Sequence, residues 1–375
     1  MLEQADTHIA LLDNDPISVV TPFLNPKVKA QRLILLAIQP LNFKLKHLVD
    51  LLRPKGIAVH CIELLKLQQP LLECLSEYVT QNMVLNVTQG NIDLQTRLIE
   101  WGKQQHAAIV WLDKKNDYLR YIYPAEQADL EVPDKIKIPD FMALLGITVK
   151  SSKTSLQTVQ AYIPIARDWA AKNECLIKGI GQLNYHAMKS NAAFIAHREL
   201  SYQEKNNPQL QQMLAQMSER GLLQLKENRI HFRSAQAKEF CNGFWLEYFC
   251  FDQMHQLRRK GLELQDIAMS VEVEYGDPQS PLRNELDVVA LINNRLYIVE
   301  CKTSNSDSKE GQRIIFRLDM LRDSFGETTQ AFWVNSLPVA SVLKKRAKHS
   351  GVYIVEAEDV SDFADLIART AKRFA

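Results

Sequence analysis

The sequence lacks the long apolar runs and paired metal ligands that mark several protein classes. No apolar run reaches the roughly 20 residues that cross a bilayer, so we expect no membrane partner. Its 6 cysteines form no C-x-x-C pair, and its 9 histidines form no H-x-H or H-x-x-x-H pair. We therefore predict neither a structural zinc site nor a disulfide framework. The scattered cysteines are typical of buried residues in a reducing compartment.

The chain also lacks a strong charge of either sign. The formal net charge is +1, so any surface for nucleic acid must be local. The N-terminus MLEQADTHIALLDNDP has no basic start and no small-residue cleavage site, which predicts a cytoplasmic location. With 375 residues, 46% of them hydrophobic and 24% charged, the chain is typical of a globular protein of two or three domains.

In the first third, apolar runs of strand length alternate with segments of helical period. The runs are 8–13, 32–38, 57–62, 83–87 and 108–112, and the helical segments between them include 43–52 and 69–81. This alternation favours a parallel sheet with helices on both faces, followed by a hairpin around 114–117. We predict a Rossmann-like domain over residues 1–140.

The middle of the chain, residues 141–233, is mostly helical. Its end, 210–232, has the pattern of a helix, a stop at Gly221 and two short strands around Glu227 and Asn228. A winged helix has this pattern, and such a unit either binds DNA or packs against neighbouring domains. No basic run lies on the helix, which favours packing. We predict a helical, winged-helix-like connector.

Residues 234–375 have the pattern of a second α/β domain. After an initial helix, the expected elements are a strand at 268–275, a hairpin within 284–303, a helix at 308–323, a strand at 330–335, a helix at 338–349, a strand at 351–357 and a final helix. The hairpin, NELDVVALINNRLYIVECKT, has two apolar runs around an Asn-Asn pair. Asn tolerates positive φ, so a two-residue turn is expected there.

This turn sets the register of the hairpin. If Asn293 and Asn294 form it, Asp287 lies directly opposite Glu300, with Cβ atoms about 5 Å apart. Lys302 points to the same face, and Cys301 to the other. Two carboxylates directly opposite each other destabilise a half-buried sheet.

A divalent cation between Asp287 and Glu300 would convert this repulsion into coordination. Carboxylate oxygens and water suit Mg²⁺ or Mn²⁺. The Lys302 ammonium could then orient or help deprotonate an attacking water, or offset charge on a phosphate. The alternative is that the three are solvent-facing charges on an exposed sheet face. Their common face, and a helix with Glu247 before them and another after them, favour the site.

The motifs GFWLEYF (243–249), NELD (284–287) and VECKT (299–303), in this order, resemble those of the PD-(D/E)XK nuclease superfamily. Their combination is similar to that of CRISPR ancillary nucleases, in which a CARF sensor domain precedes a restriction-endonuclease-like domain. The resemblance implies that Glu247, Asp287 and Glu300 hold the metal and that Lys302 assists the chemistry. Gln312 and Arg317 are expected to face the same site. Glu285 is expected to point away from the site and is not included among the predicted site residues.

A second candidate site lies in the first domain. The strand at 83–87 leads into Thr88-Gln89-Gly90-Asn91 and then a helix at 92–104, and a helix N-terminus can bind phosphate. The loop that begins at Asp13 and Asn14 should lie beside it, at the carboxyl edge where open α/β sheets bind ligands. The residues alone favour ordinary strand-to-helix turns for both segments over a binding site.

The family resemblance implies a ligand for these loops. In CARF domains the corresponding loops of two subunits hold a cyclic oligoadenylate, here expected to be cyclic tetra-adenylate, so the resemblance implies a homodimer. The binding residues would be Asp13, Asn14, Thr88, Gly90 and Asn91. Many relatives have a T-G-G-T-K loop, whereas this chain has a glutamine at the first glycine and no lysine. A cation from elsewhere, such as Arg97, would have to supply the lost charge.

The function expected from the resemblance is a cyclic-oligoadenylate-activated, metal-dependent endonuclease. It would cleave DNA or RNA or both in type III CRISPR defence. One alternative is a ligand-binding regulatory protein whose nuclease-like domain is inactive. Another is a restriction or repair nuclease with no nucleotide sensor. The intact Glu247, Asp287, Glu300 and Lys302 favour the active nuclease, because an inactive domain would be free to lose them.

Overall fold

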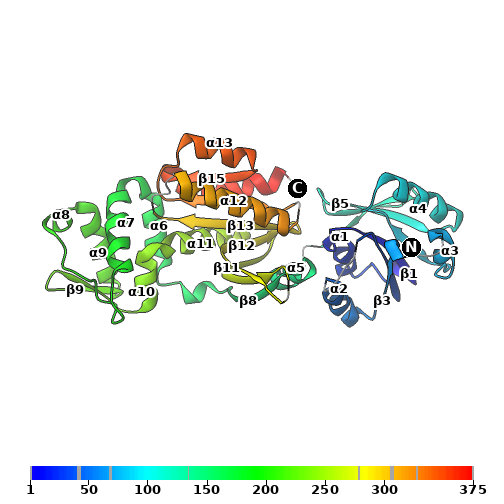
Figure 1. The fold of residues 1–375 in the computed structure, drawn as a ribbon, viewed down its shortest axis with the longest axis horizontal. Helices are drawn as coiled ribbons and strands as arrows, with labels where there is room; N and C mark the ends of the chain where they lie inside the picture. The colour runs from blue at the N-terminus through cyan, green and yellow to red at the C-terminus, as the bar shows by residue number, and fades with distance from the viewer. Residues whose placement is uncertain are drawn as a thin grey trace.

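The computed structural model describes residues 2–39, 44–66, 70–133, 135–277, 279–304, 308–326 and 328–373. Three parts lie along the long axis of the molecule (Figure 1). The N-terminal domain is at one end and the helical connector is at the other. The C-terminal domain lies between them, so the order in space differs from the order in the chain. No helix in these ranges is long and apolar enough to cross a bilayer.

The N-terminal domain is built on a seven-stranded sheet in the order β3-β2-β1-β4-β5-β6-β7. The strands are β1 (Thr7–Leu12), β2 (Arg32–Ala37), β3 (Ala58–Glu63), β4 (Met83–Asn86), β5 (Ala108–Asp113), β6 (Tyr118–Tyr123) and β7 (Leu130–Glu131). The first five are parallel to one another, whereas β6 pairs antiparallel with β5 and β7 pairs antiparallel with β6. Every residue of β1 and β4 is buried, as expected for parallel strands covered on both faces. The predicted Rossmann-like domain is confirmed.

The strand order also locates a crevice. The helices of this domain are α1 (Ile17–Val20), α2 (Lys44–Leu52), α3 (Leu71–Ser76) and α4 (Ile92–Gln104). The chain proceeds from β1 outward through β2 to β3, and then returns to the other side of β1 to form β4. The loops after β1 and β4 therefore leave the same edge of the sheet side by side. Such a reversal is where doubly wound sheets bind ligands.

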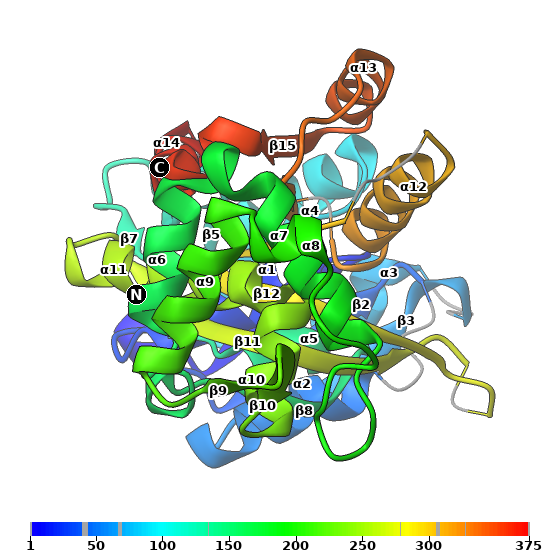
Figure 2. The same ribbon diagram turned by 90° about the vertical axis from the view of Figure 1, so that its left-hand side faces the viewer.

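The connector helices from residue 163 onward form the far end of the molecule and face the viewer in Figure 2. The elements from 138 to 239 are α5 (Ile138–Leu144), β8 (Thr148–Lys153), α6 (Ile163–Ala171), α7 (Asn173–Met188), α8 (Tyr202–Lys205), α9 (Pro208–Glu219), β9 (Leu223–Lys226), β10 (Arg229–Phe232) and α10 (Ala235–Glu239). Glu227 and Asn228 both have positive φ and connect β9 to β10, as the winged-helix pattern predicts. One strand grouped with the connector, β8, instead pairs with the C-terminal sheet.

The C-terminal sheet has six strands in the order β15-β14-β13-β12-β11-β8. Its remaining elements are α11 (Trp245–Arg259), β11 (Leu264–Tyr275), β12 (Leu282–Ile292), β13 (Arg295–Lys302), α12 (Ser308–Ser324), β14 (Gln330–Asn335), α13 (Ser341–His349), β15 (Val352–Glu356) and α14 (Phe363–Arg373). Helices α11 and α14 share a core with one face of the sheet and with the connector. Helices α12 and α13 share a core with the other face and with the N-terminal domain. The predicted α/β fold class is confirmed.

Candidate functional site

The register of the β12–β13 hairpin agrees with the sequence prediction. Ile292 pairs with Arg295, and the pairing continues outward to Val288 and Val299. Asn293 and Asn294 have φ of 50° and 52°, so both turn residues use the left-handed region that Asn tolerates. The next step outward from the last pair is Asp287 and Glu300, at the end of the hairpin remote from its turn.

Lys302 and Arg317 act on both Asp287 and Glu300. Glu300 is 3% exposed, and its carboxylate pairs with Lys302 Nζ at 2.6 Å and with the guanidinium of Arg317 on α12. The charges of Lys302 and Arg317 also act to lower the pKa of Asp287. Cys301 points to the opposite face, where its Sγ lies 3.8 Å from Cys250 Sγ of α11. The predicted division of β13 between two faces is confirmed.

Glu247 supplies a further carboxylate from the first turn of α11. It is 9% exposed. Burial raises the pKa of its carboxyl well above the ordinary value, and the negative charges of Asp287 and Glu285 raise it further. Burial also raises the pKa of Asp287, although Lys302 and the backbone N–H of Cys301 oppose this shift. That N–H donates to Asp287 Oδ2 at 2.7 Å. The site therefore concentrates negative charge in a place with little water.

Glu285 is exposed and lies two residues before Asp287 on β12. Its negative charge adds to burial and to the charge of Asp287 in raising the pKa of Glu247. Arg317 faces the site as expected, whereas Gln312 lies on the exposed side of α12.

A strained glycine determines where Glu247 lies. Gly243 interrupts the helical backbone just before α11 with φ of 120°, in a region that side chains rarely adopt. A Cβ at this position would lie 2.6 Å from Thr303 Oγ1, directly after β13. The start of α11 thus approaches the end of β13 closely. The glycine of the G-x-W-L-E motif is explained by this contact.

The carboxylates fit a divalent cation in part. Within the described ranges, no three His, Cys, Asp or Glu side chains are arranged so that they could hold a metal ion. The carboxylate of Glu300 forms ion pairs with Lys302 and Arg317. Glu247 is buried and Asp287 is half-buried, the charge of Asp287 raises the pKa of Glu247 after burial itself, and carboxylates are the donor type that Mg²⁺ and Mn²⁺ bind.

The second candidate site is a cavity of about 450 Å³ at the crevice of the N-terminal sheet. Asp13, Asn14, Thr88 and Gly90 line it. The Thr88 hydroxyl also accepts a hydrogen bond from the backbone N–H of Leu112 at 2.8 Å and donates to Asn86. Thr88 therefore also holds β4 and β5 together.

Asn91 has a local role at the start of α4. Its side chain caps the helix by accepting from the backbone N–H of Leu94 at 2.9 Å. Arg97, suggested as a source of positive charge, is half exposed on α4, where it faces Asp93 at 3.8 Å. Lys114 also lines the cavity, and at 38% exposed it is the more accessible source of positive charge there, whereas the lining residue Arg295 is 4% exposed.

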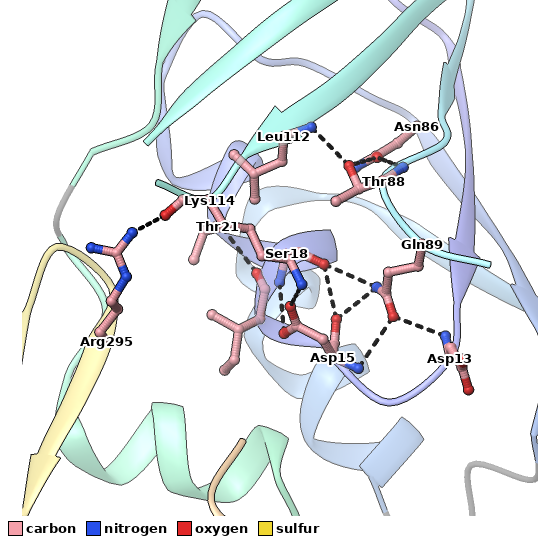
Figure 3. A network of polar contacts seen from close by, with 11 residues as sticks. Asp13, Asp15, Ser18, Thr21, Asn86, Thr88, Gln89, Leu112, Lys114 and Arg295 are labelled. Carbon is pink, nitrogen blue, oxygen red and sulfur yellow. Dashed lines mark hydrogen bonds and ion pairs between the residues drawn. The ribbon is translucent and has the colours of Figure 1, made fainter. Parts of the chain in front are cut away.

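Gln89 joins the two loops of the cavity (Figure 3). Its side-chain oxygen accepts from the backbone N–H of Asp13 at 2.9 Å and of Asp15 at 3.2 Å. Its amide nitrogen donates to the carbonyl of Asp15 at 2.7 Å and to Ser18 Oγ at 2.9 Å. The residue that departs from the relatives' glycine thus fixes the loop after β1 against the loop after β4.

The far wall of the cavity comes from the C-terminal domain. Asn293, Asn294 and Arg295 of the β12–β13 turn line it, together with residues at the end of α12. Arg295 donates hydrogen bonds to the carbonyls of Lys114 and Lys115 in the β5–β6 turn. The two candidate sites are therefore at opposite ends of one hairpin.

Asp117 provides a test of the electrostatics at this wall. Burial raises the pKa of its carboxyl to about 6, partly opposed by a hydrogen bond from Asn294. Because the native pKa exceeds the unfolded one, this group favours folding below about pH 4, and the contribution is lost as pH rises through about 6. We expect Asp117→Asn to be more stable than the wild type at pH 7.5, by about 1–3 kcal/mol, and to lose that advantage at pH 4.

Urea unfolding at the two pH values measures this difference. Asp93→Asn, on the exposed face of α4, is the control and should change stability equally little at both. A gain for Asp117→Asn that is the same at pH 4 and pH 7.5 would contradict the assignment.

Comparison with known proteins defines the class of the C-terminal domain. Residues 234–373 match the family model described as "Card1-like, endonuclease domain". The match contains Glu247, Asp287, Glu300 and Lys302. The C-terminal domain is therefore similar to Card1-like endonuclease domains, which confirms the resemblance for this part of the chain.

Solved structures share the fold of the whole chain. Protein VC1899 from Vibrio cholerae is 23% identical, with a TM-score of 0.88 over 99% of both chains. Can2 from Sulfobacillus thermosulfidooxidans, in complex with cyclic tetra-adenylate, is 18% identical, with a TM-score of 0.76 over 98% of this chain and 97% of that one. A type III CRISPR defence DNA nuclease activated by cyclic oligoadenylate is 16% identical, with a TM-score of 0.50 over 90% of this chain and 47% of that one. A search of curated proteins found no match.

Proposed function

We propose that this protein is a cyclic-oligoadenylate-activated nuclease that cleaves phosphodiester bonds with Mn²⁺ or Mg²⁺ in type III CRISPR defence. The main observation is the pair of carboxylates of buried Glu247 and half-buried Asp287, whose pKa values are raised by desolvation within an endonuclease-family domain. Two desolvated carboxylates gain from a shared cation, so the site is prepared for a metal rather than for a neutral ligand.

The residues around the pair have distinct roles in this proposal. Glu247 and Asp287 would hold the cation, with Glu300 as the third ligand when it leaves Arg317. A bound cation would supply Lewis-acid polarisation of the phosphate and a more acidic water. Lys302, about one-third exposed, would orient the water or offset charge on the phosphate. Arg317 is positioned to take up negative charge at the same place.

The activator would bind at the crevice of the N-terminal sheet. Asp13, Asn14, Thr88 and Gly90 line the cavity there, and Asn91 caps the helix beside it. Can2, which shares the fold, was solved with cyclic tetra-adenylate, and that ligand is our first candidate. A cyclic ligand with internal symmetry is best matched by two copies of one surface, so we propose a homodimer with the two crevices facing each other.

The test is cleavage of labelled single- and double-stranded DNA and RNA by the purified protein. Each substrate is incubated with Mn²⁺ or Mg²⁺ and with cyclic oligoadenylates of different ring size, while light scattering reports the oligomeric state. We expect cleavage that needs both a metal ion and one of the activators, from a dimer. Activator binding without cleavage of any substrate would favour the inactive regulatory protein. Cleavage that no activator changes would favour a nuclease without a sensor.

A further inference from the structure

The cavity and the carboxylate site share one structural element, the β12–β13 hairpin. Its turn lines the cavity, and its open ends carry Asp287 and Glu300. From Arg295 to Glu300, β13 spans about 17 Å at roughly 3.3 Å per residue. It is a central strand that pairs with β12 on one side and β14 on the other, and almost all of its residues are buried. A displacement of the turn would therefore be transmitted along the strand rather than absorbed by it.

Arg295 connects this turn to the N-terminal domain. It is 4% exposed, and its guanidinium donates to the carbonyl of Lys114 (Figure 3). It also donates to the carbonyl of Lys115. Asn294 adds a weaker hydrogen bond to Asp117 Oδ1 at 3.4 Å. All three acceptors belong to the β5–β6 turn or its edge, so these hydrogen bonds connect the hairpin to one short segment of the N-terminal domain.

The side chain of Lys114 connects the same segment to the ligand loop. Its ammonium pairs with Asp15 Oδ2 at 2.6 Å, and Asp15 belongs to the loop after β1 that Gln89 holds in place. Lys114 is 38% exposed, whereas Arg295 is 4% exposed, so Lys114 is the more accessible of the two cations in the cavity lining. A phosphate that enters the cavity would compete with the Asp15 carboxylate for this ammonium.

We propose that Arg295 relays occupancy of the cavity to the nuclease site within one chain. An anionic ligand that draws Lys114 away from Asp15 changes the position of the β5–β6 turn. The carbonyls of that turn hold Arg295, and Arg295 begins the strand that carries Glu300 and Lys302. The inference rests on the proposed function, and it adds a route of regulation inside each subunit to any rearrangement of the dimer.

The variant Arg295→Met tests the relay. The turn has an independent anchor in its own domain, because Gln265 exchanges hydrogen bonds with Asn294 at 2.7 and 2.9 Å, so we expect the hairpin to remain folded. The predicted result is that cyclic tetra-adenylate binds with an affinity within about 2-fold of the wild type, while the activation of cleavage falls at least about 10-fold. Arg283→Met, an exposed arginine near the other end of β12, is the matched control and should keep full activation.

Hydrogen exchange with bound cyclic tetra-adenylate gives a readout that does not need cleavage. In the wild type, the ligand should change exchange at amides of the β12–β13 turn and β13, and in Arg295→Met this change should disappear from β13. If the change in β13 or full activation persists in Arg295→Met, the relay is overturned and the proposed function stands. If the variant loses ligand binding, Arg295 is a ligand contact and the relay is likewise overturned.

If the wild type shows neither binding nor activation, the proposed function and the relay both fail. Arg295→Lys, which keeps a charge but only one of the paired donors, is the second variant should Arg295→Met fail to fold. With activator, Arg295→Lys should cleave at a rate between that of the activated wild type and that of the wild type without activator. Full activation in Arg295→Lys would then overturn the relay.

Discussion

Asp287→Asn is expected to reduce metal-dependent cleavage by on the order of 10²–10³-fold or more, while the protein remains folded. The amide keeps an oxygen that can accept the N–H of Cys301 but lacks the charge that would bind a cation. Burial raises the pKa of Asp287, so its ionised form is less favourable in the native state than in the unfolded chain. Removing that charge should leave the free energy of unfolding equal or higher at pH 7.5.

Single-turnover cleavage at several Mn²⁺ concentrations and urea unfolding measure the two effects. Glu285→Gln is the control, because it removes a negative charge that acts on Glu247 from an exposed position on the same strand. It should reduce cleavage far less. Glu300→Gln should also lose cleavage, but it would leave Lys302 and Arg317 without their carboxylate and so cost stability. An Asp287→Asn protein that cleaves at the wild-type rate would refute the site.

Gly243→Ala is expected to lower the free energy of unfolding by about 2–4 kcal/mol and to reduce cleavage as well. A side chain at φ of 120° is strained, and the new Cβ would meet Thr303 Oγ1 at 2.6 Å. Either the start of α11 or the end of β13 must then move. Glu247 is on the first of these elements and Lys302 on the second, so the carboxylate site should be distorted along with the fold.

Gly181→Ala is the matched control for this prediction. Gly181 lies inside α7, and a Cβ built there meets no atom within 4 Å. Alanine favours a helix by about 0.5–1 kcal/mol over glycine, so this variant should be slightly more stable than the wild type. Equal stability of Gly243→Ala and the wild type would show that the contact with Thr303 does not constrain the site.

The elements and the hairpin register follow from local patterns in the sequence. Apolar periodicity predicted the alternation of strands and helices in the N-terminal domain, and the final α/β domain was predicted in the same way. The Asn293-Asn294 pair predicted the register of β12 and β13, since both residues tolerate the left-handed backbone that the turn requires. These features depend on neighbours in the chain, which is why composition and spacing reveal them. The roles of Glu247, Asp287, Glu300 and Lys302 stay predictions.

Tertiary contacts determined the remainder, because their partners are distant in the chain and carry no distinctive side-chain pattern. Arg295 binds backbone carbonyls of Lys114 and Lys115, about 180 positions away, and every residue has such a carbonyl. Gln89 likewise binds mainly the backbone of Asp13 and Asp15. The sequence contains both side chains, but only the packing of the C-terminal domain against the N-terminal one brings the turn of the β12–β13 hairpin to the cavity of the N-terminal sheet. That packing comes from apolar burial, which is non-directional and leaves the choice of neighbours to the fold as a whole.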